Sequence, residues 1–110
     1  MITTHVLDTA LGKPAAGIDV SLVRLESGRV VPVTQGHTNS DGRIPGWLDG
    51  IELQAGTYRI CFELEEYLAS TGQPLFYPYA EVVFVVADVT RHFHIPLLLS
   101  PFGYSTYRGS

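Results

Sequence analysis

The sequence predicts an all-β protein, a sandwich of two sheets built from seven to eight strands with one short helix. Short runs of β-forming residues recur between turn signals, which is typical of sandwiches and barrels. Within these runs apolar and polar residues alternate, so that each strand has one face for the core. The chain has 110 residues. This length accommodates one core, so residues 1–110 are expected to form a single domain.

The first half of the chain contains two predicted strands and three turns. A strand-like segment over 3–7 carries His5, and a second over 18–22 alternates apolar with polar residues. Gly, Pro, Asn and Asp concentrate between the apolar runs, where they favour turns. The predicted turns are 13–17, 39–42 and 54–56.

The second half begins with the clearest strand, 57–64, in which Tyr58, Ile60 and Phe62 share one face. The segment 63–72 predicts the one helix, because Leu64, Tyr67 and Leu68 have i, i+3, i+4 spacing and Gly72 suits the position after the last turn. The final strands are predicted over 79–87 and 91–99. The segment 79–87 is apolar on both faces, as expected for a strand between the core and a second covering surface.

The composition excludes several partners. Hydrophobic residues make up 45% of the chain and charged residues 16%, and the net charge is −4. An acidic chain without a Lys/Arg cluster is not expected to bind nucleic acid or an anionic membrane. A mean hydropathy of +0.16 in so small a domain indicates an oligomer interface. Cys61 is the only cysteine, which excludes an internal disulfide and a cysteine-based zinc site.

The two ends of the chain predict its location. The N-terminal segment has no basic region followed by an apolar one, and no apolar run reaches the length of a membrane span. The C-terminus is not the peroxisomal signal Ser-Lys-Leu. We therefore expect a cytoplasmic protein, or a periplasmic one if a leader has been removed.

Candidate chemistry collects near the end of the chain. His92 and His94 are two residues apart, so on a strand they share a face, and the alternating residues Phe93 and Ile95 point toward the core. The tail 104–110 adds two tyrosines, Arg108 and a C-terminal carboxylate to this apolar strand. Residue composition thus predicts polar chemistry on the face of the strand that points away from the core.

Structural interpretations of the same residues remain open at this point. A histidine on a strand is more often a hydrogen-bonded surface or interface residue than a catalytic one, and we interpret His92 in this way. Arg43, after the turn 39–42, is more often a solvated charge than an anion clamp. Tyr104 and Tyr107 fit the end of an edge strand, and Cys61 fits a half-buried apolar position. Composition and periodicity alone predict an oligomeric β sandwich with a histidine-bearing surface, and no particular reaction.

Seven segments extend the interpretation through a resemblance. They are 4–10 with 12–15, 41–43, 56–58, 80–84, 94–101 and 104–110. In these segments the chain resembles the transthyretin-like family, and specifically its branch of 5-hydroxyisourate hydrolases. Transthyretin, the hormone carrier, is similar through 80–84 and 98–106, but it lacks the histidine corresponding to His94 and does not end in Tyr-Arg-Gly-Ser. This chain has both features of the enzyme branch.

The resemblance implies a transthyretin-like (prealbumin-like) sandwich that assembles as a homotetramer, a dimer of dimers around a central channel. It implies hydrolysis of 5-hydroxyisourate in urate degradation, a step of purine metabolism, without a cofactor or a metal. It also assigns roles to residues, and His92 is not among them. The catalytic residues it implies are His5, Arg43, His94 and Ser110. The substrate-binding residues it implies are His5, Arg43, Tyr107, Arg108, Gly109 and Ser110.

This hydrolysis needs a base for water, donors for the developing oxyanion and a proton for the leaving nitrogen. We expect neutral His5 or His94 to activate the water and the other imidazole to donate, and the sequence leaves open which is the base. Arg43 would hold the ring and stabilise the oxyanion through its fork of donors. Arg108 and the Ser110 carboxylate would orient the imidazoles or bind ring amides.

Two other functions remain open from the sequence. One is a non-catalytic carrier with the same sandwich and channel. The other is a zinc hydrolase in which His5, His92 and His94 are the ligands.

Overall fold

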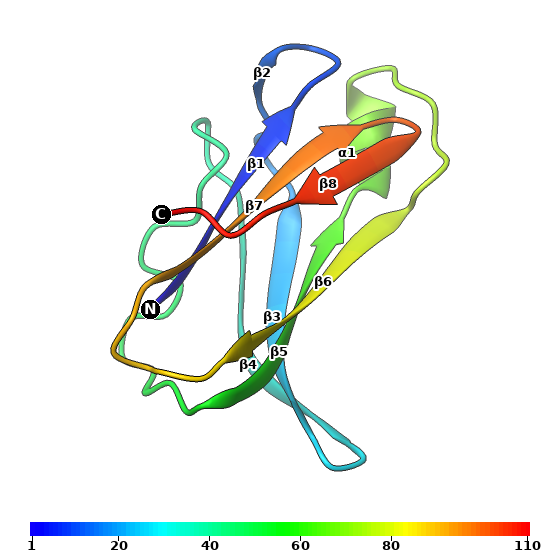
Figure 1. The fold of residues 1–110 in the computed structure, drawn as a ribbon. Coiled ribbons are helices and arrows are strands. Elements are labelled where there is room, and N and C mark those ends of the chain that lie inside the picture. The colour runs from blue at the N-terminus through cyan, green and yellow to red at the C-terminus, as the bar shows by residue number, and fades with distance from the viewer.

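The computed structural model describes residues 1–110, and its eight strands form two four-stranded sheets that pack face to face (Figure 1). The first sheet has the order β2-β1-β7-β8 and the second β4-β3-β5-β6. The predicted all-β sandwich of two sheets with one short helix is therefore confirmed. The strands of the first sheet are β1 (Ile2–Asp8), β2 (Lys13–Pro14), β7 (Phe93–Ser100) and β8 (Gly103–Thr106). Those of the second are β3 (Asp19–Glu26), β4 (Arg29–His37), β5 (Gly56–Glu63) and β6 (Tyr79–Val86).

The core lies between the sheets and is made by the alternating residues that the sequence indicates. On β5, Tyr58, Ile60 and Phe62 are fully buried. Phe93 and Ile95 of β7 also belong to the core cluster, so the face of β7 that carries His94 points away from it. The alternation of side chains along β7 therefore places His94 on the face that points away from the core.

The helix α1 (Glu65–Ser70) is shorter than the predicted 63–72. Strand β5 continues to Glu63, so the helix begins only after Leu64. At its other end the Thr71 hydroxyl donates to the Tyr67 carbonyl at 2.9 Å. Gly72 follows with a φ of 69°, a left-handed conformation that glycine adopts without strain, as its predicted place after the helix requires.

One predicted turn is partly wrong. Lys13 and Pro14, assigned to a turn over 13–17, form the two-residue strand β2 and pair with Asp8 and Leu7 of β1. The chain reverses earlier, and the Gly12 amide closes this turn on the Asp8 carbonyl at 2.8 Å. Proline is compatible with an edge strand because its missing N–H need not join a ladder.

The helix is tied to β1 through one buried carboxylate. Asp8 is 1% exposed. Its Oδ2 accepts hydrogen bonds from the Tyr67 hydroxyl at 2.6 Å and the Gln73 amide at 2.9 Å. Its Oδ1 accepts one from the Leu11 amide at 2.9 Å. Burial alone would raise the pKa of Asp8, but these donors favour the charged form and lower it below the usual value.

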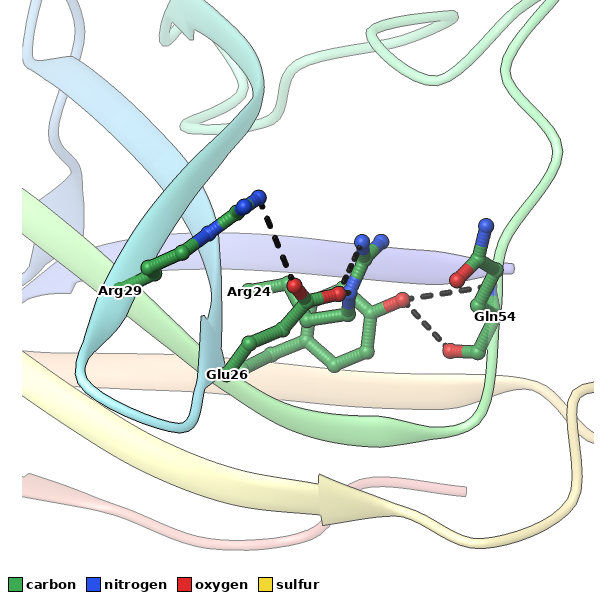
Figure 2. Close-up of polar contacts among 5 residues, drawn as sticks. Arg24, Glu26, Arg29 and Gln54 are labelled. Atoms are coloured by element: carbon green, nitrogen blue, oxygen red, sulfur yellow. Dashed lines mark hydrogen bonds and ion pairs between the residues drawn. The ribbon is translucent and has the colours of Figure 1, made fainter.

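A second polar cluster holds the end of the second sheet beside the β3–β4 hairpin (Figure 2). Glu26 accepts from Arg24 at 2.7 Å and lies 3.6 Å from Arg29. Next to it, the Tyr58 hydroxyl donates to the Gln54 carbonyl at 2.6 Å. These charges pair with one another within the hairpin.

The only helix, six residues long, is too short to cross a membrane. Strand β6 lies at the edge of its sheet and leaves a row of apolar side chains uncovered. Tyr79, Val83 and Val85 are 50%, 57% and 64% exposed. The predicted strand is therefore present, but its open face is not wholly apolar. Glu81 lies on that face and pairs with Arg59 at 3.1 Å.

Candidate active site

The long-range pairing of β1 with β7 brings the two predicted catalytic histidines together. The strands run parallel, and Thr3 pairs with His94 while His5 pairs with Pro96. On β1, Thr3 and His5 alternate with buried residues, and on β7 His94 lies between buried Phe93 and Ile95. His5 and His94 therefore lie on neighbouring strands and on the same outer face of the first sheet.

Arg43 reaches the same place from the loop after β4. The Asn39 side chain accepts hydrogen bonds from the amides of Asp41 and Arg43, at 2.9 and 3.1 Å, which fixes the predicted turn. The turn then joins β1 by a bridge between Arg43 and His5 and by a bond from the Val6 amide to the Gly42 carbonyl at 2.8 Å. The backbone of Arg43 is thus anchored beside His5, and its side chain is exposed.

Gly42 is required by this approach. Its φ is +74°, and a Cβ there would lie 2.4 Å from the Val6 carbonyl and 3.3 Å from the His5 ring. Only glycine combines the left-handed conformation with so close a contact.

The C-terminal tail lies along β7. Gly109 pairs with His94 in the same register that joins Thr106 to Leu97, and its amide donates to the His94 carbonyl at 2.8 Å. A Cβ at Gly109 would lie 2.5 Å from His94 Cδ2. The predicted tail residue Gly109 thus packs directly against the imidazole of His94.

The other predicted tail residues lie differently. The Arg108 guanidinium stands over the Phe93 ring, 4.7 Å from its centroid, on the opposite face of β7 from His94. Tyr107 is 55% exposed, and Ser110 is exposed beyond Gly109. Tyr107 and Arg108 line an apolar groove of about 220 Å³ between β6 and the tail. Their substrate-binding roles, and the catalytic role of Ser110, remain predictions.

Thr3 is a site residue that the sequence did not single out. Its Oγ1 lies 2.7 Å from His92 Nε2 and 2.8 Å from His94 Nδ1. His92 is exposed and hydrogen-bonded, which agrees with its interpretation as a surface residue. The signal available in the sequence was that Thr3 and His5 share a face of one strand, but nothing in the sequence placed that face beside 92–94.

The surroundings of His94 favour its neutral form. Burial lowers the pKa of His94. The charge of Arg43 lowers it further, as do His92 and His5 when they are protonated. A neutral imidazole has one donor and one acceptor nitrogen, as proton transfer near neutral pH requires.

Other chemistry is not supported by the arrangement. Burial and neighbouring Glu63 raise the pKa of Cys61 to about 11, which disfavours the reactive thiolate. No group of three or more His, Cys, Asp or Glu side chains is arranged to hold a metal ion. His92 Nε2 and His94 Nδ1 are both hydrogen-bonded to the Thr3 hydroxyl. The three-histidine zinc site is therefore not favoured.

The largest hollow, about 630 Å³, is elsewhere. Residues of β3, β4 and β5 line it, including Asp19, His37 and Glu63 on the outer face of the second sheet. Neither His5, Arg43 nor His94 contributes to it, so side-chain chemistry and not cavity size identifies the candidate site.

The fold and this arrangement define a class of protein: a two-sheet β sandwich with two imidazoles and a guanidinium on the outer face of one sheet. The HIUase/Transthyretin family model matches residues 2–109. This chain belongs to the HIUase/Transthyretin family.

Relatives and solved structures agree with this membership. The chain is 50% identical over 111 residues to the 5-hydroxyisourate hydrolase of Mus musculus, covering 99% of this chain and 94% of the relative. It is 48% identical over 114 residues to 5-hydroxyisourate hydrolase 2 of Rhizobium meliloti (strain 1021), covering 99% and 95%.

Three structures show the same sandwich. Klebsiella pneumoniae 5-hydroxyisourate hydrolase has a TM-score of 0.82 at 38% identity, covering 99% of this chain and 98% of that one. Sea bream transthyretin, solved with thyroxine, has a TM-score of 0.91 at 30% identity and coverage of 98% and 93%. (S)-allantoin synthase has a TM-score of 0.89 at 38% identity; 99% of this chain aligns with only 43% of that one.

Proposed function

We propose that this protein is an enzyme that hydrolyses 5-hydroxyisourate, a step in urate degradation. The observation that carries the proposal is the convergence of His5, Arg43 and His94 on one outer sheet face, from two strands and a loop far apart in sequence. The relatives that carry the name 5-hydroxyisourate hydrolase match nearly the full chain.

The reaction adds water across a ring C–N bond: the hydroxide joins the carbonyl carbon, the bond breaks, and the leaving nitrogen takes a proton. In this scheme His5 and His94 move the two protons, and each such transfer contributes about 10²- to 10⁴-fold in rate. Arg43, next to His5, stabilises the negative charge on the carbonyl oxygen. No cofactor takes part in this scheme.

The tail completes the site in this proposal. Gly109 packs against the His94 ring and bonds its backbone. In this scheme Ser110, which follows Gly109, orients the imidazoles or binds ring amides through its polar groups. Serine as the nucleophile is disfavoured because no hydrogen bond links Ser110 to a base.

A passive carrier is the second candidate. Sea bream transthyretin, with the same fold, was solved with thyroxine. Carriage of an apolar ligand makes no use of paired imidazoles beside a guanidinium, which is the feature that favours the hydrolase.

The deciding experiment follows the decay of 5-hydroxyisourate, generated fresh from urate and uricase, with and without the protein. Wild type should accelerate the decay, and His94→Ala should lose the acceleration while retaining the wild-type thermal transition and native mass. His37→Ala is the matched control, because His37 is exposed on the other sheet and should behave like wild type. Decay at the spontaneous rate with wild type would leave the carrier as the better function.

The proposal extends to assembly and location. The apolar row on the outer face of β6 supports a second copy at that edge, and the family resemblance implies a homotetramer, a dimer of dimers. A cytoplasmic location is part of the proposal and is tested by fractionation of cells that express the gene with its own start.

A further inference from the structure

The Thr3 hydroxyl lies between two imidazoles on the outer face of the first sheet. Oγ1 is 2.7 Å from His92 Nε2 and 2.8 Å from His94 Nδ1, both within the range of good hydrogen bonds. The two rings are 6.2 Å apart and inclined at 53°, so they meet through the hydroxyl and do not stack.

The number of hydrogens limits what this bridge can do. A hydroxyl has one hydrogen to donate and two lone pairs to accept with, and each neutral imidazole has one donor and one acceptor nitrogen. With a single hydroxyl hydrogen between them, the two nitrogens that face Thr3 cannot both be acceptors. An acceptor nitrogen on one ring therefore requires a donor nitrogen on the other.

Both contacts can form with neutral rings in three ways, and two of them use the hydroxyl hydrogen between the rings. In the third, both rings donate to Thr3 and the hydroxyl hydrogen is left without a protein acceptor, so the two that use it are favoured. In one, His92 Nε2–H donates to Thr3, and Thr3 donates to His94 Nδ1. In the other, His94 donates to Thr3, and Thr3 donates to His92. A charged His92 has hydrogens on both nitrogens and can only donate. The first direction is thus compatible with both charge states of the exposed His92, while the second requires that His92 be neutral.

We propose that Thr3 and His92 are positioning residues that hold His94 with its hydrogen on Nε2. Nδ1 is occupied as the acceptor from Thr3, so the second nitrogen of the ring offers a donor on the face shared with His5. This inference rests on the proposed hydrolase. Within it, His94 delivers the proton to the leaving nitrogen and His5 is the base, a choice that the sequence left open.

The backbone supports this role. Thr3 and His94 are register partners in the parallel ladder, and Gly109 packs on the other side of the imidazole. The ring is thus held from β1 on one side and from the tail on the other. The lowered pKa of His94 favours the neutral ring, which is the form that has a tautomer to be fixed.

The first test reads the tautomer directly, by ¹⁵N NMR of histidine-labelled full-length protein, with signals assigned from single histidine variants. In wild type, Nε2 of His94 should carry the hydrogen, and Nδ1 should show the shift of a nitrogen that accepts a hydrogen bond. A wild-type spectrum with the hydrogen on His94 Nδ1 would overturn the proposal. This reading does not depend on turnover, so it stays separate from any failure of the proposed function.

The second test compares Thr3→Val, Thr3→Ser and a control, Thr9→Val. Valine keeps the shape of threonine and loses the hydroxyl, serine keeps the hydroxyl, and Thr9 makes a comparable hydroxyl bond to the Leu99 carbonyl away from both rings. Thr3→Val should move the His94 Nδ1 signal and lower kcat by about tenfold to a hundredfold with little change in KM, because a positioned proton transfer is partly lost.

Thr3→Ser should restore the wild-type spectrum and rate, and Thr9→Val should retain them. If Thr3→Val leaves kcat unchanged, or if Thr3→Ser is as impaired as Thr3→Val, the positioning role is refuted. Should Thr3→Val fail to fold, the wild-type spectrum and the Thr3→Ser variant still decide.

Discussion

Glycine and threonine shape this site as much as the histidines and the arginine that would do its chemistry. Gly42 lets the Arg43 turn approach β1, and Gly109 lets the tail approach His94. Thr3 occupies the space between two imidazoles. In each case a small side chain decides where a reactive one can lie.

Gly109→Ala tests the contact between tail and imidazole. The new Cβ would lie 2.5 Å from His94 Cδ2, so the ring must move. We expect kcat/KM for 5-hydroxyisourate to fall by about a hundredfold, the cost typical of a displacement near 1 Å. Gly103→Ala is the control, because a Cβ there meets only Ser100 Oγ at 3.7 Å. Equal activity of the two variants would show that the contact does not matter.

A pH titration tests the environment of His94. Burial and then the charges of Arg43, His92 and His5 lower its pKa below the ordinary 6.5. The NMR midpoint of His94 should therefore lie below 6.5, and Arg43→Gln should raise it by removing one positive charge. If the neutral ring is the active form, the acid limb of kcat/KM follows this midpoint to lower pH. A midpoint at or above 6.5 would contradict the burial and charge that we describe.

At the scale of elements, the short helix α1 depends on its link to β1. It has no side-chain cap at its start, and six residues are too few for a helix to be stable alone. Its buried Tyr67 and Leu68 pack on the core, and the Tyr67 hydroxyl bonds the Asp8 carboxylate at 2.6 Å. The same strand β1 carries Thr3 and His5, so the link also holds the strand of the site.

Tyr67→Phe should lower the free energy of unfolding by about 2 kcal/mol at pH 7, because a hydrogen bond to a buried charged group is lost. Asp8 has a lowered pKa in the folded chain, so its stabilisation is present above the unfolded pKa of about 3.9 and is lost as the pH falls through the folded value. The difference between wild type and variant should therefore shrink in acid. Urea titrations at pH 7 and at low pH measure both effects.

Tyr77→Phe is the matched control, since the ring contacts Phe76 and Tyr104 but the hydroxyl makes no hydrogen bond. A loss of stability in Tyr67→Phe that does not change with pH would exclude the carboxylate as its cause.

At the scale of the whole molecule, the uncovered row on β6 indicates that the single chain is not the complete unit. Edge strands with exposed apolar side chains invite pairing with another chain. Tyr79, Val83 and Val85 are at least half exposed along this edge. The apolar groove between β6 and the tail continues the same surface toward Tyr107.

Val85→Lys should reduce the native mass by weakening this contact, measured by size-exclusion chromatography with light scattering. Val85 is 64% exposed, so a lysine there costs the single chain little. Val30→Lys is the control, because Val30 is 54% exposed on β4, away from this edge. A wild-type protein that is monomeric, or a tetramer that Val85→Lys leaves intact, would refute assembly through β6.

Much of the fold follows from local pattern. Alternation with a period of two requires only the sequence of one strand, so it identified β5 and β7 and the outward face of His94. The element ends were less accurate. The helix was predicted to begin two residues too early, and Lys13 with Pro14 was assigned to a turn. Both ends depend on which strand pairs with which, and strand pairing cannot be read from the local sequence.

The candidate site was predictable only in part. The resemblance supplied His5, Arg43, His94 and the tail, and the structure brings the first three and Gly109 together. It places Arg108 on Phe93, on the other face of β7. Thr3 was missed, because its role depends on which strand lies next to β1.

The sequence alone determined that this chain is a β sandwich, which residues face its core, and which family it resembles. These follow from local periodicity and from the motifs themselves. Only the tertiary structure decided that β1 lies parallel to β7, a pairing across some ninety residues that places Thr3 beside His94. Strand pairing is non-local, and it is set by the free energy of packing the whole core. The hydrogen-bonded environment of His94 therefore emerges only when the two sheets close on each other.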